Sequence, residues 1–383
     1  MRSWLVVSCI ACASPSIAGP RVVTAPPAEL RTWNLSAHYT KHVDVHGFPI
    51  LGSEAVSDAA LHEAAYLVEQ MIGHREDILE RLAKNKVRFV VMAPTELTTD
   101  VPEHSDLEPK DYWDKRARGL GATNIRPAVS CGEENLLNLA GDPYSTENIL
   151  VHELSHAIHQ MALVDLDATF EKRLIAAYEA SKKAKRWANT YAMDNVMEYW
   201  AEGAQSWFDT NRANDNQHGP IATRAQLVKY DRPLAALLQE VFGDRPWRYR
   251  KIADRDAAGR AHLAGWNPVK GRTFVWPERL ANTRIDNVPV AVVGARIQLT
   301  KTVMGASPST TKKTSLVFAN YRKREVVVEW IDFAKKAVAY QTLKPDARYT
   351  QDTYVGHVWR VVEAGRVLGY TSAPAAAATV EIR

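Results

Sequence analysis

The chain has 383 residues, of which 46% are hydrophobic and 24% charged, and its formal net charge is +4. This composition excludes a disordered or collagen-like chain, and the length allows two domains. The basic residues are dispersed, and the densest run, 182–186, is more typical of a solvated helix face than of a nucleic-acid interface. We therefore expect a globular protein that binds no nucleic acid.

The N-terminus has the pattern of an export signal. Arg2 supplies the positive start, residues 4–13 an apolar run, and Ser16-Ile17-Ala18 a cleavage site of small residues. The run is too short to span a membrane, and no other segment is apolar enough, so we expect no transmembrane segment. Residues 1–18 are therefore predicted to be a signal peptide of a secreted or periplasmic protein. A lipid anchor is the alternative, because residues 6–9 faintly resemble a lipoprotein box.

Periodic patterns begin after this segment. Residues 57–84 predict one long amphipathic helix, because apolar side chains recur at helical spacing. Residues 87–93 predict a strand that is closed by Pro94, and residues 100–118 are polar and predict a loop. Loss of the signal peptide would leave Cys131 as the only cysteine, so an internal disulfide is not expected.

The stretch His152-Glu153-Leu154-Ser155-His156 is the most informative part of the chain. In a helix, His152 and His156 lie one turn apart on one face, so both imidazoles can reach the same metal ion. Glu153 is turned slightly aside, near where a metal-bound water would lie. Two His ligands and a carboxylate base are the arrangement of a zinc-dependent hydrolase. A surface helix with incidental His and Glu is the structural alternative.

A zinc site of this kind needs a third protein ligand. His159 stands where one common pattern has glycine, which argues against a third ligand within the same motif. Glu198 and Glu202 lie one turn apart in the amphipathic run 195–208, and two carboxylates on an aromatic, half-buried face are poorly solvated without a cation. Zinc resolves this if one Glu is a ligand and the other accepts the second N–H of a liganding His. The spacing leaves open which Glu is the ligand, and a solvated acidic stripe is the alternative.

These motifs resemble the gluzincin metallopeptidases and, among them, the catalytic domain of anthrax lethal factor. The resemblance covers about 145–208 and includes a Tyr seven residues before the ligand Glu. It implies an α+β, zincin-like metallopeptidase domain over 19–265, in which an edge strand pairs with the substrate, and 134–138 is the candidate strand. The implied roles are Zn²⁺ ligand for His152, His156 and Glu198, general base for Glu153, support of a ligand for Glu202, and oxyanion donor for Tyr191.

The C-terminal part has a different pattern. Residues 266–304 have no clear period and predict a connector that packs on the peptidase domain. Residues 305–383 predict a small all-β sandwich, because they contain five or more short strands without a helix. The expected strands are 315–320, 326–330, 337–343, 354–362 and 367–371.

Nearly all of 312–383 resembles the β domain of the von Hippel-Lindau tumour suppressor. The runs that carry this resemblance, in the order and spacing of that domain, are 317–320, 328–333, 340–345 and 353–359. That domain binds a peptide through a hydroxyproline in an aromatic pocket. Flat aromatic walls suit a pyrrolidine ring, and a hydroxyl and an imidazole can pair with its OH. The resemblance places the peptide-binding pocket on Trp330, Tyr340, Thr353, Tyr354, His357 and Trp359.

Three positions depart from that family. Thr353 stands where the family has Ser, Asp352 where it has His, and Val355 where it has Arg. The pocket survives these changes, whereas the contacts along the rest of the peptide are in question. The structural alternative is that Trp330 and the other large aromatic residues form only the core of the sandwich.

Together these patterns predict an exported zinc metallopeptidase that hydrolyses peptide bonds. Its C-terminal β domain is expected to bind the peptide or protein substrate, including proline- or hydroxyproline-rich chains. Two alternatives remain at this point. One is a non-catalytic peptide-binding or adhesive protein with a structural zinc site, and the other is a zinc hydrolase of a non-peptide amide.

Overall fold

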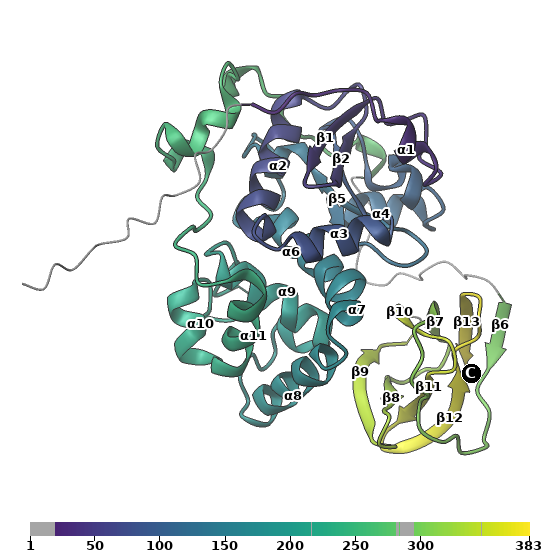
Figure 1. Ribbon diagram of the computed structural model, residues 1–383. Helices are drawn as coiled ribbons and strands as arrows, with labels where there is room; N and C mark the ends of the chain where they lie inside the picture. The colour runs from purple at the N-terminus through teal and green to yellow at the C-terminus, as the bar shows by residue number, and fades with distance from the viewer. Residues whose placement is uncertain (1–19, 216, 281–282, 284–294, 346) are drawn as a thin grey trace, which may run out of the picture.

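A computed structural model describes residues 20–215, 217–280, 283, 295–345 and 347–383. The fold is α+β, as expected: an N-terminal part combines one sheet with helices, and a C-terminal module consists of two sheets packed as a sandwich (Figure 1). The predicted signal peptide lies outside the described residues. Within the described ranges, we find no helix that is both long and apolar enough to cross a bilayer.

The N-terminal sheet has the strand order β1-β2-β3-β5-β4. Strands β2, β3 and β5 are parallel, whereas β1 and β4 pair antiparallel at the two edges. The hairpin between β1 and β2 turns at His46 and Gly47, which both have positive φ. The bounds are β1 Lys41–Val45, β2 Phe48–Gly52, β3 Arg88–Met92, β4 Gly119–Leu120 and β5 Ala128–Gly132.

Two helices replace the single helix expected over 57–84. The first, α2 (Asp58–Ile72), begins at the cap Ser57, whose side chain accepts a hydrogen bond from the Ala60 N–H, and it ends at Gly73. The second, α3 (Glu76–Lys84), follows after a short turn. The apolar period continues across this break, because both helices pack on the same core, and the periodicity therefore concealed the turn.

The prediction of an edge strand at 134–138 was wrong. Residues Glu133–Leu136 form the short helix α5, and the buried carboxylate of Glu134 pairs with Arg118 at 2.5 Å. The edge strand of the sheet is β4 instead, which directly follows the segment 100–118. That segment was expected to be a loop, but it contains the helix α4 (Lys110–Arg116) and a 3-10 turn at Pro102–His104.

The helical half of the N-terminal part follows the sheet. Asn148 caps α6 and Asn195 caps α9, because each side chain accepts backbone N–H groups of the first turn. Helix α6 lies between β5 and α9, with a buried apolar face on both sides. The bounds are α1 Ala28–Arg31, α6 Ile149–Ile158, a π-turn His159–Leu163, α7 Val164–Leu166, α8 Phe170–Lys183, α9 Val196–Trp207, α10 Arg224–Tyr230 and α11 Arg232–Phe242.

The C-terminal module has the predicted sandwich architecture, with sheets ordered β10-β7-β13-β6 and β12-β11-β8-β9. Strand β13 pairs parallel with both β6 and β7, and the other pairs are antiparallel. The bounds are β6 Ala295–Gln298, β7 Lys313–Asn320, β8 Val326–Ile331, β9 Ala337–Leu343, β10 Arg348–Tyr354, β11 Val358–Glu363, β12 Arg366–Ser372 and β13 Ala378–Ile382.

The strand boundaries of this module differ from the expected ones at three places. The strand expected over 354–362 begins only at Val358, as β11, because the chain turns at Gly356 with φ of +87°, and the strand before that turn, β10, was not expected. Strand β6 lies within the expected connector 266–304 and joins the sandwich. The sequence pattern also did not predict β13, although this strand is central in its sheet.

The connector packs on the N-terminal part, as expected. Phe274 and Leu280 form a small apolar cluster with Leu97, and Arg279 pairs with the buried Asp114 at 2.9 Å. The connector therefore belongs to the N-terminal core up to Leu280.

Polar contacts join the sandwich to the helices α7, α8 and α9. The Tyr340 hydroxyl donates to Glu171 Oε1 at 2.7 Å, and Lys313 Nζ lies 3.0 Å from Asp165 Oδ2. Asn195 Nδ2 donates to the side chain of Gln341 at 3.1 Å. The module therefore has a defined orientation on the helical half.

Candidate metal centre and aromatic pocket

Three predicted ligands meet between α6 and α9. His152 and His156 project from one face of α6, and their Nε2 atoms are 3.1 Å apart. The Oε2 atom of Glu198, on α9, lies 3.1 Å from His152 Nε2 and 3.4 Å from His156 Nε2. Among the described residues, these three form a group whose potential ligand atoms all lie within 4.8 Å of one another.

This geometry fits a tetrahedral zinc ion. With metal–ligand bonds of 2.0–2.1 Å, the ligand atoms of such a site are about 3.3 Å apart. The charges agree. Burial would lower the pKa of His152, but Glu198, Glu153 and Glu202 together hold it well above its usual value. The centre therefore has an excess of carboxylates, which a divalent cation would neutralise.

Glu153 lies beside this centre, on the face of α6 that meets the edge strand. Burial raises the pKa of its carboxyl group, while His152 and His156 oppose that shift. A Cβ atom on Gly121 would lie 3.1 Å from His156 Cβ and 3.4 Å from Glu153 Oε2. The chain just after β4 thus passes close over α6, and an extended peptide paired with this edge would lie against Glu153.

Tyr191 begins a 3-10 turn (Tyr191–Met193) that directly precedes α9. Its ring is stacked with that of His152 at a centroid distance of 6.2 Å. Burial and the charge of Glu198 raise the pKa of its hydroxyl, against the opposing charge of Arg116. The hydroxyl therefore keeps its proton and can act as a donor. Arg116 ends α4, and its position near the cleft was not predicted from the sequence.

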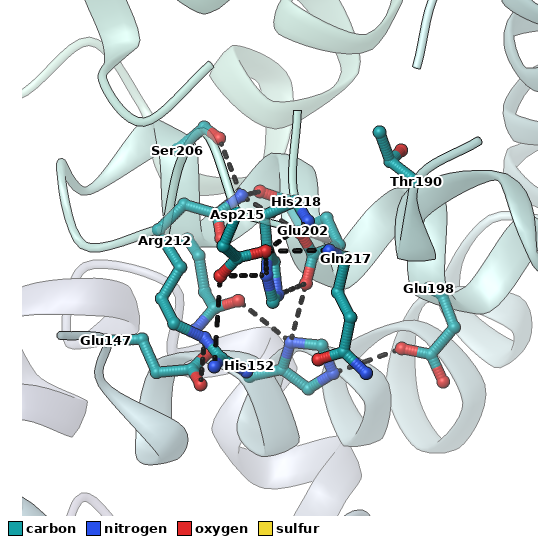
Figure 2. A network of polar contacts seen from close by, with 12 residues as sticks. Glu147, His152, Thr190, Glu198, Glu202, Ser206, Arg212, Asp215, Gln217 and His218 are labelled. Atoms are coloured by element: carbon teal, nitrogen blue, oxygen red, sulfur yellow. Dashed lines mark hydrogen bonds and ion pairs between the residues drawn. The ribbon is translucent and has the colours of Figure 1, made fainter. Parts of the chain in front are cut away.

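The support behind His152 differs from the expected one. The Nδ1–H of His152 donates to Gln205 Oε1 at 2.9 Å. The Oε1 atom of Glu202 lies 3.7 Å from the same nitrogen (Figure 2). Gln205 therefore takes the hydrogen-bonding role predicted for Glu202, which contributes charge. Gln205 follows Glu202 by three residues on α9, and helical spacing could have identified it.

The same network continues into the loop after α9. Gln205 Nε2 donates to Glu147 at 3.0 Å, and Glu147 pairs with Arg212 at 2.8 Å. His218 Nδ1 lies 2.9 Å from Asp215 Oδ1, and its other ring nitrogen faces Glu202 at 3.7 Å (Figure 2). Glu147, Arg212, Asp215 and His218 were not predicted from the sequence, because they lie in loops beside α6 and α9. They fix the orientation of the His152 ring.

The six residues predicted to bind peptide all line one cavity of about 560 Å³. Strands β8, β9, β10 and β11 supply the walls, and the turn between β10 and β11 supplies His357. Trp359 is only 2% exposed and packs on Phe318, so the aromatic residues are part of the sandwich core as well as pocket walls.

Polar atoms in this pocket lack partners. The His357 ring stacks on Trp330, with centroids 5.4 Å apart, and neither His357 Nε2 nor Trp330 Nε1 has a hydrogen-bond partner, although both atoms are buried. Burial lowers the pKa of His357 to about 4, so its imidazole is neutral near pH 7. The Thr353 hydroxyl accepts a hydrogen bond from Trp359 Nε1 at 3.2 Å and keeps its own proton to donate.

The other wall of the cavity belongs to the N-terminal part and was not predicted. Gln160, Glu171, Met197 and Asn124 line it opposite the aromatic rings. The backbone N–H of Asn124 donates to Asp352 at 3.3 Å. Asp352, which departs from the expected family residue, is therefore a contact between the two parts of the chain.

Comparison with known proteins supports the C-terminal module. A family model of the VHL beta domain matches residues 306–367. The matched region contains all six residues that were predicted to line the pocket, from Trp330 to Trp359. The module is thus similar in sequence to the VHL beta domain, and its two-sheet architecture is consistent with that domain. No curated protein matches the chain.

Proposed function

We propose that this chain is an exported zinc-dependent metallopeptidase of the gluzincin type, whose VHL-like module binds the substrate peptide. The observation that carries the proposal is the convergence of His152, His156 and Glu198, with Glu153 beside them and an edge strand alongside. Residues 1–18 would act as the export signal. A neutral imidazole with a free ring nitrogen, His357, supports binding of hydroxyproline by the module.

His152, His156 and Glu198 would hold the ion. When bound, zinc polarises a substrate carbonyl and makes water acidic enough to lose a proton near neutral pH. Glu153 accepts that proton and returns it to the leaving amine. Tyr191 donates its hydroxyl hydrogen bond to the oxygen that becomes negatively charged. The edge strand β4 and the chain directly after it hold the peptide in an extended conformation. This distinguishes a peptidase from a hydrolase of small amides.

The test combines metal analysis with cleavage of a peptide library. The wild type should bind one equivalent of zinc and cleave peptides. Glu153→Gln should retain the zinc and lose activity by at least about a hundredfold, because an amide cannot accept the proton of water. The exposed Glu179→Gln serves as the matched control and should cleave at the wild-type rate. Equal rates for wild type and Glu153→Gln would contradict the mechanism.

Tyr191→Phe tests the oxyanion role separately. Its hydrogen bond forms mainly in the transition state, so kcat should fall by about ten- to a hundredfold with little change in KM. A rise in KM alone would assign Tyr191 to ground-state binding.

A further inference from the structure

We infer that the metal centre and the aromatic pocket are two ends of one groove, which takes a single extended peptide in a fixed register. This inference rests on the proposed function and adds to it a defined spacing between the residue in the pocket and the bond at the centre.

The first argument is continuity between the two sites. Gln160 lines the cavity and lies four residues beyond His156, in the π-turn that continues α6. Met197, another lining residue, directly precedes Glu198, and Asn124 lies three residues beyond Gly121. The stretch that continues α6, the first turn of α9 and the chain after β4 therefore all reach from the centre to the wall of the cavity.

The second argument is the polar chemistry inside the cavity. The unpartnered Trp330 Nε1–H needs an acceptor, and the neutral His357 needs a partner for Nε2. A hydroxyl group on a ring-sized residue can accept from one atom and donate to the other. Phe333 also lines this cavity and is 58% exposed, so the cavity reaches the surface there and a peptide can enter it.

The third argument is that contacts on several sides fix the two ends relative to each other. Glu171 on α8 meets Tyr340, and Asp165 on α7 meets Lys313. On the side of the edge strand, the Asn124 N–H meets Asp352. A module held from these separate elements presents its pocket at one distance from the centre, whereas a flexibly tethered module would present it at many.

The helix gives an approximate value for that distance. From His156, the lining residues on this stretch of helix run from His159 to Asp165, which corresponds to about 5–14 Å along the helix axis. An extended peptide covers about 3.3 Å per residue. The pocket residue should therefore lie about two to four residues from the cleaved bond.

The experiment moves one hydroxyproline stepwise along an otherwise constant peptide and maps the products of the zinc-loaded full chain by mass spectrometry. The cleaved bond should move with the hydroxyproline, two to four residues away and always on the same side. Cleavage at positions that do not follow the hydroxyproline would overturn the inference.

Two variants sharpen this map. Gln160→Trp places a large side chain between the two ends and should lower cleavage of the hydroxyproline peptides by about tenfold. Gln239→Ala, at an exposed position on α11, is the control and should give the wild-type map. A wild-type map from Gln160→Trp would contradict a continuous groove.

A second readout needs neither zinc nor catalysis, so it separates failure of the inference from failure of the proposed function. A photo-reactive residue is placed three positions from the hydroxyproline, on either side, in a peptide bound to the metal-free full chain. On one side it should cross-link to 119–124 or to α6. Cross-links confined to 305–383 for both placements would overturn the inference, even if the wild type cleaves peptides.

Discussion

The metal-centre cleft and the aromatic pocket differ in how many of their polar atoms have partners within the protein. In the cleft, imidazoles and carboxylates lie close together, and each supports another: Gln205 orients His152, and Glu147 orients Gln205. In the pocket, aromatic rings form the walls, and the polar atoms His357 Nε2 and Trp330 Nε1 have no partner.

Because of this difference, the two sites are expected to bind different kinds of ligand. In the cleft most polar groups are hydrogen-bonded, but an excess of negative charge remains and Glu202 Oε1 accepts no hydrogen bond, so a cation completes it. The pocket leaves a donor and an acceptor unsatisfied, so a neutral hydroxyl completes it. Charge should therefore decide what binds in the cleft, and hydrogen bonding together with ring shape should decide what binds in the pocket.

The largest expected effect comes from comparing separate substitutions of two histidines on neighbouring turns, His156 and His159. His156→Ala should lose the zinc and all activity, because two ligands remain. His159→Gln should keep a full equivalent of zinc, because His159 is bound to Glu171 beside the pocket and points away from the centre. Metal analysis of both purified variants checks this. Zinc loss from His159→Gln, with retention in His156→Ala, would reverse the assignment.

The next effect concerns the support of His152. Gln205→Ala removes the acceptor at 2.9 Å and should weaken zinc binding by about ten- to a hundredfold. Glu202→Gln keeps that hydrogen bond and changes only a charge 3.7 Å away, so its effect should be smaller. Competition with a chelator of known affinity measures both variants. A larger loss for Glu202→Gln would restore the role that the sequence suggested for this residue.

A smaller effect is expected in the pocket. The wild type should bind a hydroxyproline peptide about tenfold more tightly than the matched proline peptide, because the added hydroxyl satisfies His357. His357→Ala and Thr353→Val should each erase most of that difference. Calorimetry on the full chain provides the measurement, with Gln239→Ala as the control. Equal affinities of the wild type for both peptides would mean that the aromatic residues only form the core of the sandwich.

The smallest effect is the titration of His357 itself. Its pKa should be about 4, because burial disfavours the charged ring more than Glu171 favours it. The unfolded chain binds this proton near pH 6.5, so His357 lowers the stability of the fold as the pH falls from about 6.5 to 4. Asp352, with a pKa raised to about 6 by burial, acts in the opposite direction over part of that range. NMR titration, assigned with His357→Gln, isolates the histidine, and a pKa near 6.5 would show that the pocket is open to water.

Helical periodicity and local motifs were sufficient for the core of the cleft. His152 and His156 are four residues apart on one helix, and the rise and twist of a helix alone bring such residues together. The second helix, with Glu198, was recognised from its own pattern and from the resemblance to gluzincins. The six pocket residues were likewise placed by resemblance, and they do line one cavity.

Tertiary structure alone decided the remaining features. The edge strand is β4 and not 134–138, because the buried pair of Arg118 and Glu134 holds the latter segment in a helix. The contact of Glu171 with Tyr340 joins residues 169 positions apart, which no local pattern can reveal. Local spacing fixes which side chains share a face of one element, but burial, charge pairing and the packing of distant elements determine what that face meets.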